Sequence, residues 1–430
     1  MLFRSAGIFS AGDTVQYYFK IPYDDHLPTF IYGNDNARFN SELESAAQAD
    51  PFTYTVQPPL QPSGSYIAVT NSTLEARVYQ STGHIALTGP DLAGTPFANT
   101  LIFEPPAFKA GGESMLAGRV LSTTTFGNGL QLVQAAGATS IISRLTFPFE
   151  GVMRYEVIDW GGLPVSETSV TAPSDASEHA YGFGEKFADF DKSGKKVHIM
   201  TEDQAGDKSD DAYKVAPWFV STKGYGFHLD DSTESWFDMR NQFADRYVIS
   251  NFVASSCASC ITNALKFNIV YGPRLPDVIT RYTGYTGRPP APPKWAFAPW
   301  MSSDIWHDGG EVRYAVQKYR TLGIPGSTWV FDSPWERAYN DFQWNTNQFT
   351  VGNTYEGTFY NGFGTIGDMM TFLRTNGFYV VCWMTPFINT SSNNEGIPGQ
   401  NTGQAANYAF ASNNNYFVRA SVGGPPLVAN

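Results

Sequence analysis

A single carboxylate stands where a run of apolar residues ends. Residues 327–335 read Ser-Thr-Trp-Val-Phe-Asp-Ser-Pro-Trp, so Asp332 follows three large apolar side chains. Such a run is typical of a buried parallel strand, and Pro334 predicts that the strand stops there. In a (β/α)8 barrel, catalytic and substrate-binding groups gather at such strand tips. The alternative is that Asp332 only caps the following turn, as Asp often does.

Strands and helices alternate around this run. Residues 296–301 are expected to form a strand, and residues 311–322 place apolar side chains on one helical face before Gly323. Residues 365–375 predict a second helix, and residues 378–383 predict a third buried strand. This βαβαβ order predicts a parallel sheet with right-handed crossovers.

The earlier part of the chain has a different period. Apolar and polar residues alternate over short segments, at residues 15–21, 65–69, 74–79, 141–147 and 153–158. This pattern predicts an antiparallel β-sandwich, with no helix before residue 283. Four prolines in residues 289–293 mark a boundary. We therefore expect a sandwich over residues 1–285 and part of a barrel, about three βα units, over residues 286–430.

Composition excludes several classes of function. The net charge is -12 and no run of Lys or Arg could follow a phosphate backbone, so we expect no nucleic-acid partner. No apolar stretch reaches 18 residues, so we expect no membrane partner. The first residues lack the apolar segment of a secretory signal. The protein is expected to be cytoplasmic, or secreted with its true N-terminus missing.

The three cysteines predict no metal site. Cys257 and Cys260 form a Cys-x-x-Cys pair without a second pair or a His cluster nearby. They are expected to be free thiols, or a disulfide in an oxidising compartment. Cys382 lies in an apolar run and is expected in the core.

Five segments follow one another in order along the chain. The first, residues 181–187, reads Tyr-Gly-Phe-Gly-Glu-Lys-Phe, and the others lie at residues 213–226, 282–295, 331–345 and 382–388. Together they resemble glycoside hydrolase family 31, in which the last four are a Pro-aromatic and Gly-Tyr-Gly hairpin, a domain junction and two barrel strands with their loops. The resemblance implies that Glu185 serves the fold.

The resemblance implies a galactose-mutarotase-like β-sandwich followed by the first part of a (β/α)8 barrel. It implies hydrolysis of α-glycosidic bonds with retention, which needs two carboxyl groups about 5–5.5 Å apart. In this family both lie after barrel strand four, and no Asp or Glu here matches either motif. We therefore name no catalytic residue and expect an N-terminal fragment.

Substrate binding does carry over from the resemblance. Asp332 matches the aspartate that holds sugar hydroxyls before the scissile bond, and a carboxylate accepts two hydroxyl protons. Trp300, Ile305, Trp306 and Trp383 resemble residues that line the pocket, although a lone Trp is more often core.

A loop of the sandwich offers a further candidate. Asp203 resembles a family carboxylate that reaches into the barrel mouth, with Asp207 as its rival. The alternative is that this Asp-rich loop is a solvated acidic turn. Pro334 stands where many α-glucosidases of the family carry a second acid, so the sugar stays open.

These features together predict that the intact protein is a glycosidase of α-glucosidase type, which cleaves terminal α-linked sugars. No metal or cofactor is expected. The expected partner is an oligosaccharide or glycoside; the oligomeric state is left open. Alternatives within the family are α-xylosidase, α-galactosidase and α-transglycosylase activity. Outside catalysis, the alternatives are a carbohydrate-binding protein and an inactive truncated product.

We expect residues 1–430 alone to turn over neither aryl α-glucoside nor aryl α-xyloside. The reason is that both reacting carboxyl groups lie beyond Asn430 by resemblance. An assay beside a protein extended through the barrel measures this. Turnover by the short chain, abolished by Asp332→Asn, would contradict the expectation.

Overall fold

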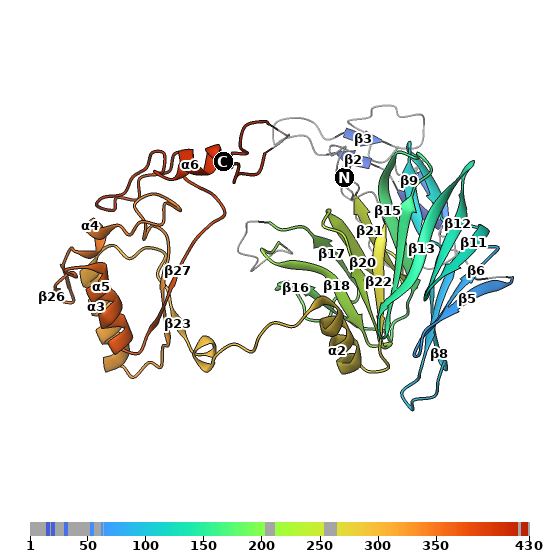
Figure 1. The fold of residues 1–430 in the computed structure, drawn as a ribbon, viewed down its shortest axis with the longest axis horizontal. Coiled ribbons are helices and arrows are strands. Elements are labelled where there is room, and N and C mark those ends of the chain that lie inside the picture. The colour runs from blue at the N-terminus through green and yellow to red at the C-terminus, as the bar shows by residue number, and fades with distance from the viewer. Residues whose placement is uncertain are drawn as a thin grey trace. The chain divides into compact units, whose positions relative to one another are not determined.

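This computed structural model describes residues 64–202, 211–252, 265–419 and 423–428, together with residue 62 and the backbone of four short early strands. Those strands pair as β1 (Thr14–Tyr17) with β4 (Phe52–Thr55), and β2 (Phe19–Ile21) with β3 (Phe30–Tyr32). The chain forms two compact units, Met1–Arg288 and Pro289–Asn430. Figure 1 shows their ribbons, and each unit is described by itself.

Three antiparallel sheets build most of the first unit. The eight-stranded sheet runs β11 (Val120–Phe126), β12 (Gly129–Ala136), β13 (Thr139–Phe149), β14 (Val152–Asp159), β22 (Lys266–Tyr271), β19 (Tyr225–Leu229), β18 (Val215–Ser221), β16 (Ala180–Gly184). The six-stranded sheet runs β10 (Glu113–Leu116), β9 (Ala107–Ala110), β15 (Val165–Pro173), β21 (Arg246–Phe252), β20 (Ser235–Met239), β17 (Lys195–Ile199). The four-stranded sheet runs β5 (Tyr66–Thr70), β6 (Glu75–Tyr79), β7 (Ile85–Gly89), β8 (Asn99–Phe103).

Alternation along the strands makes the core of this unit. On β12 and β13 every second side chain is buried, as a half-buried strand requires. The buried faces meet in an aromatic core centred on Phe219, whose ring stacks on Phe227 at 6.0 Å and meets Phe237 edge-on at 6.2 Å. The predicted antiparallel β-sandwich is confirmed.

The two glycines of the Tyr-Gly-Phe-Gly segment lie in a bulge of β16, where the backbone geometry requires them. The register against β18 shifts between Gly182 and Gly184, whose φ angles are 141° and 75°. A Cβ on Gly182 would lie 2.6 Å from the main-chain oxygen of Trp218. The bulge turns Phe183 inward, where it is fully buried and stacks on Phe219.

The Gly-Tyr-Gly hairpin makes room for an aromatic stack. A Cβ on Gly226 would lie 2.0 Å from the ring of Trp218. That ring stacks on Tyr282 with centroids 3.7 Å apart, and Tyr282 belongs to α2 (Leu275–Thr286). The prediction that no helix precedes residue 283 is therefore wrong. The sequence of α2 is rich in Thr and Tyr, which favour strands, but burial of Val278 against the sheet selects the helix.

The second unit contains the predicted βαβαβ arrangement. Strands β23 (Trp300–Met301), β24 (Thr328–Phe331) and β27 (Tyr379–Cys382) pair in parallel. Helices α3 (Gly309–Thr321) and α5 (Ile366–Thr375) connect them, and both lie on one side of the strands in Figure 1. Asp308 caps α3 through the N–H of Glu311, and α5 begins with a capping box.

Some expected elements of this unit differ. The strand expected over residues 296–301 is instead the 3-10 helix η1 (Lys294–Phe297) followed by β23 alone, because Pro299 cannot donate to a ladder. The connection between β24 and α5 contains α4 (Thr346–Phe349) and the hairpin β25 (Asn353–Tyr355) and β26 (Thr358–Tyr360). The helix α6 (Tyr408–Asn413) follows β27 and was not expected.

The expectations for membrane spans and for the cysteines concern residues that the structure describes only in part. No helix within the described ranges is long and apolar enough to cross a membrane. Cys382 is half-buried and packs against the core of the second unit. Cys257 and Cys260 lie outside the described residues.

We expect Gly182→Ala to lower the free energy of unfolding by about 2–4 kcal/mol, because it adds a steric clash to an unfavourable φ. Gly194→Ala is the matched control, since Gly194 also has a positive φ, 78°, but open space around its Cβ position. That control should cost about 1 kcal/mol. Urea denaturation measures both, and equal losses would contradict the steric explanation.

Candidate functional site

Asp332 lies directly after β24, at the C-terminal end of the middle strand of the parallel sheet. Its side chain is half-buried. The N–H of Ser333 donates to Oδ1 at 2.7 Å. This contact is what the turn-capping alternative predicts, but it uses only one carboxylate oxygen. Within the described part of the chain no hydrogen bond to Oδ2 is present, so Oδ2 can accept from a ligand.

Trp383 occupies the corresponding tip of β27. Its main-chain N–H donates to the carbonyl of Phe331 at 2.8 Å, which extends the parallel ladder by one residue. Its half-buried ring meets Tyr339 edge-on, with centroids 6.0 Å apart. The indole Nε1–H of Trp335 donates to the carbonyl of Trp383 at 2.8 Å. The two strand tips are therefore joined both through the ladder and through a side chain.

A small surface pocket opens beside these tips. Its lining comes from the loop after β24, from Trp383 and from the polar segment that follows β27, namely residues 333–339, Trp383, Gln400 and Asn401. Main-chain bonds hold the later segment in place, since Asn401 donates to Arg337 at 2.5 Å and Asn389 donates to Tyr339 at 3.1 Å. The pocket encloses no space that a water molecule could fill, and Asp332 is not among the residues that line it.

The other three predicted pocket residues lie around β23. Trp300 is 46% exposed, and its Nε1–H donates to the carbonyl of Ala296 at 3.2 Å. Ile305 is half-buried. Trp306 is buried at 3% exposure and stacks on Trp329 at 4.5 Å, within the core of the unit. The structure therefore brings Trp383 next to Asp332, while Trp306 also has the role of a core residue.

Glu336 is a buried acid that sequence reasoning did not single out. It is 3% exposed, and Oε2 accepts from the main-chain N–H of Asn340. Burial, reinforced by the nearby charge of Asp341, raises the pKa of Glu336 to about 7. The segment 331–345 contains it, but its burial depends on how that loop folds, which the sequence pattern does not reveal.

Two family models match the chain. Residues 29–238 match the Glycosyl hydrolase 31 N-terminal galactose mutarotase-like domain, and residues 289–428 match the Glycosyl hydrolases family 31 TIM-barrel domain. The chain belongs to glycoside hydrolase family 31. The predicted family, and the predicted sandwich with a partial barrel, are confirmed.

Individual family 31 relatives match about half of the chain. An isomaltosyltransferase of Sporosarcina globispora is 28% identical over 221 residues, 50% of this chain and 20% of that protein. Alpha-xylosidase XylQ of Lactiplantibacillus pentosus is 28% identical over 219 residues, 50% of this chain and 26% of that protein. The matched region therefore spans between a fifth and just over a quarter of the length of these two relatives.

A solved structure supports the fold. The cycloalternan-forming enzyme from Listeria monocytogenes, in complex with a pentasaccharide substrate, superposes with a TM-score of 0.58 at 18% identity. The match covers 86% of this chain and 43% of that one. At this identity the likeness concerns the fold alone.

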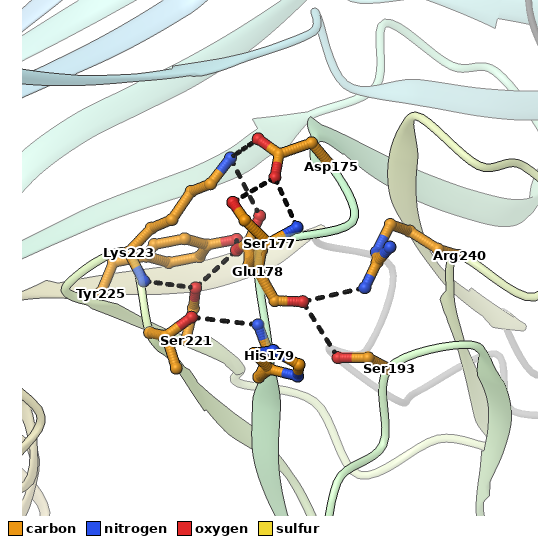
Figure 2. Close-up of polar contacts among 10 residues, drawn as sticks. Asp175, Ser177, Glu178, His179, Ser193, Ser221, Lys223, Tyr225 and Arg240 are labelled. Carbon is orange, nitrogen blue, oxygen red and sulfur yellow. Dashed lines mark hydrogen bonds and ion pairs between the residues drawn. The ribbon is translucent and has the colours of Figure 1, made fainter.

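A second polar cluster of this family 31 chain lies in the sandwich, around the fully buried Glu178 (Figure 2). Its Oε1 accepts from Ser221 at 2.5 Å and from Tyr225 at 2.9 Å. Its main-chain carbonyl accepts from Arg240 at 2.8 Å and from Ser193 at 3.1 Å. One residue thus bonds to strands or turns of both large sheets.

Charge balances this buried acid. Lys223 lies 3.5 Å from Oε2 of Glu178 and donates to Asp175 at 2.6 Å. Hydrogen bonds from Lys223 and Ser177 hold the pKa of Asp175 well below its usual range. Burial, with the charge of Glu178, raises the pKa of Tyr225 well above its ordinary value. We assign this cluster to the stability of the sandwich.

The remaining predicted site residues cannot be placed. Asp203 and its rival Asp207 lie outside the described residues, so their place at a pocket stays a prediction. Across the ranges that the structure describes, no three His, Cys, Asp or Glu side chains gather as metal ligands.

We expect Trp335→Phe to destabilise the second unit by about 1 kcal/mol more than Trp344→Phe. Both changes remove the same atoms from one aromatic cluster, in which the two rings lie 4.6 Å apart. Only Trp335→Phe leaves the carbonyl of Trp383 without its donor. Urea denaturation followed by far-ultraviolet circular dichroism measures the difference. Indistinguishable midpoints would show that this bond contributes nothing.

Proposed function

We propose that the intact protein is a retaining α-glycosidase of the α-glucosidase type, in which Asp332 holds hydroxyl groups of the terminal sugar. The observation that carries the proposal is the place of Asp332 at a parallel-strand tip, with no hydrogen bond to Oδ2 within the described residues and with Trp383 at the tip of the neighbouring strand. It is supported by membership of family 31 and by the order of the family motifs along the chain.

The geometry suits this role for physical reasons. Oδ1 is anchored by the N–H of Ser333, so the carboxylate enters binding with little freedom left to lose. Oδ2 then accepts hydroxyl protons in charge-assisted bonds, which are stronger than neutral ones. The rings of Trp383 and Tyr339 offer apolar surface for the C–H groups of a sugar. These contacts bind and orient the sugar.

The reaction itself is assigned to the whole protein. Retention needs a nucleophile and an acid/base about 5–5.5 Å apart, and we propose that both come from barrel strands outside residues 1–430. We also propose the domain division inferred above, a sandwich over residues 1–285 and a barrel part over residues 286–430.

The sugar and the acceptor have alternatives. The relatives include an α-xylosidase and an isomaltosyltransferase, so we keep α-xylosidase and α-transglycosylase activity beside α-glucosidase and α-galactosidase activity. Pro334, which is buried, supplies no second carboxylate next to Asp332. A non-catalytic carbohydrate-binding protein, or an inactive product, is the alternative from another class. A carbohydrate-binding protein would bind sugar without turnover in the extended protein. An inactive product would show neither binding nor turnover.

In the protein extended through the barrel, we expect Asp332→Asn to lower kcat/KM for an aryl α-glycoside at least 100-fold. The reason is that a charge-assisted contact to the sugar strengthens in the transition state and is lost on substitution. Steady-state assays with aryl α-glucoside, α-xyloside and α-galactoside measure the loss and identify the sugar.

The control for this experiment is Glu356→Gln. Glu356 is an exposed carboxylate between β25 and β26 that pairs with Lys318 at the surface, so its loss removes the same charge from the same unit. Unchanged turnover in Asp332→Asn would remove Asp332 from the site and leave the turn-capping role.

A further inference from the structure

Glu336 lies four residues after Asp332, and the contacts of its buried carboxyl lead to the turn after β27. Its Oε2 accepts from the N–H of Asn340, while its buried Oε1 has no hydrogen-bond partner within the described residues. Asn340 is 1% exposed and has a φ of 59°, in the left-handed region. Asn adopts this conformation more readily than most residues with a side chain, and here its main-chain N–H is also held by Glu336.

The side chain of Asn340 bonds to Thr385, in the turn after β27. Its Oδ1 accepts from the main-chain N–H of Thr385 at 3.2 Å, and its Nδ2–H donates to Oγ1 of Thr385 at 2.7 Å. Thr385 lies two residues after Trp383. A second tie comes from Asn407, which donates to the carbonyl of Asn340 at 2.8 Å. The contacts therefore run from Glu336 through Asn340 to the turn that carries Trp383.

We propose that Glu336 is a positioning residue for the sugar site: it fixes the main chain of Asn340, and Asn340 holds the turn after β27 so that Trp383 stays beside Asp332. That the positioned site binds a sugar rests on the proposed function. The contacts from Glu336 to Thr385 are present without a sugar. It assigns Glu336 no contact with substrate.

The ionisation of Glu336 gives this role a distinctive property. The titratable groups that face it in the described residues are Asp341 from its own loop and Cys382 from β27. Neither offers a positive charge to balance a buried carboxylate. Below about pH 7 Glu336 is neutral, and above it a charge appears in the loop beside Asp341. The bond from Asn340 favours the charged form, but burial opposes it more strongly, so we expect the folded loop to open more readily at pH 8.5 than at pH 6.

Hydrogen exchange of the full chain tests the proposal without a ligand. The readout is the protection of residues 339–345 and 383–388, corrected for intrinsic exchange, at pH 6 and pH 8.5. We expect wild-type protection of both segments to fall at least five-fold at the higher pH. Glu336→Gln is neutral and keeps an acceptor for Asn340, so it should keep the protection of both segments within two-fold of the wild-type value at pH 6, at either pH. Glu336→Ala should lower the protection of both segments at least ten-fold at either pH.

Two internal comparisons separate positioning from general stability. Protection of α3 and α5 should stay within two-fold in every variant, and Glu356→Gln should behave as wild type throughout. Loss of protection spread equally over α3 and α5 would overturn the proposal, as would Glu336→Ala with unchanged protection at residues 383–388. Equal pH dependence in wild type and Glu336→Gln would also overturn it.

Turnover in the extended protein then distinguishes the positioning role of Glu336 from the proposed sugar-binding role of Asp332. We expect Glu336→Ala to raise KM for an aryl α-glycoside at least five-fold and Glu336→Gln to restore it at pH 6, while Asp332→Asn leaves the exchange of residues 383–388 unchanged. If no aryl glycoside is turned over by wild type, the proposed function fails, and the exchange pattern alone decides the structural part. Full exchange effects with an unchanged KM would overturn the positioning role.

Discussion

The parallel ladder between β24 and β27 is the interaction on which the site depends. It ends with the N–H of Trp383 bonded to the carbonyl of Phe331, so Asp332 and Trp383 leave the sheet at the same level. Trp335 then uses its indole N–H to hold the carbonyl of Trp383. Because these contacts hold the main chain of both strand tips, the main-chain positions of Asp332 and Trp383 are set before any ligand arrives.

The sandwich is stabilised in a different way. Its large aromatic core requires close approach of main chain and rings, and glycine is needed where a Cβ would collide. At Gly182 the neighbour is a main-chain oxygen, whereas at Gly226 it is the ring of Trp218. The glycines of the family motifs in this unit are therefore packing features.

Much of the fold could be predicted from the sequence because strong local patterns agree with burial. The apolar run before Asp332 ends at Pro334, and α3 and α5 have clear stop signals. The patterns failed at two places: α2 has residues that favour strands but buries Val278 against the sheet, and Pro299 shortens β23. Asp332 and Trp383 could be placed because a strand tip is a local property. Glu336 could not, because its environment is made by Asn340 and Thr385, which the chain brings together only on folding.

The contacts of Glu178 have a consequence for how the two large sheets of this sandwich can move. Its carbonyl is bonded by Arg240, which follows β20 of one sheet, and its carboxylate by Ser221 and Tyr225 of the other. Glu178 stands two residues before β16 and therefore moves with the sheet that contains Ser221 and Tyr225. If the sheets slid past each other by a single residue, these two bonds would remain and the bond from Arg240 would break. The main-chain carbonyl of Glu178 should therefore resist sliding of the sheets, in addition to the packing of the aromatic core.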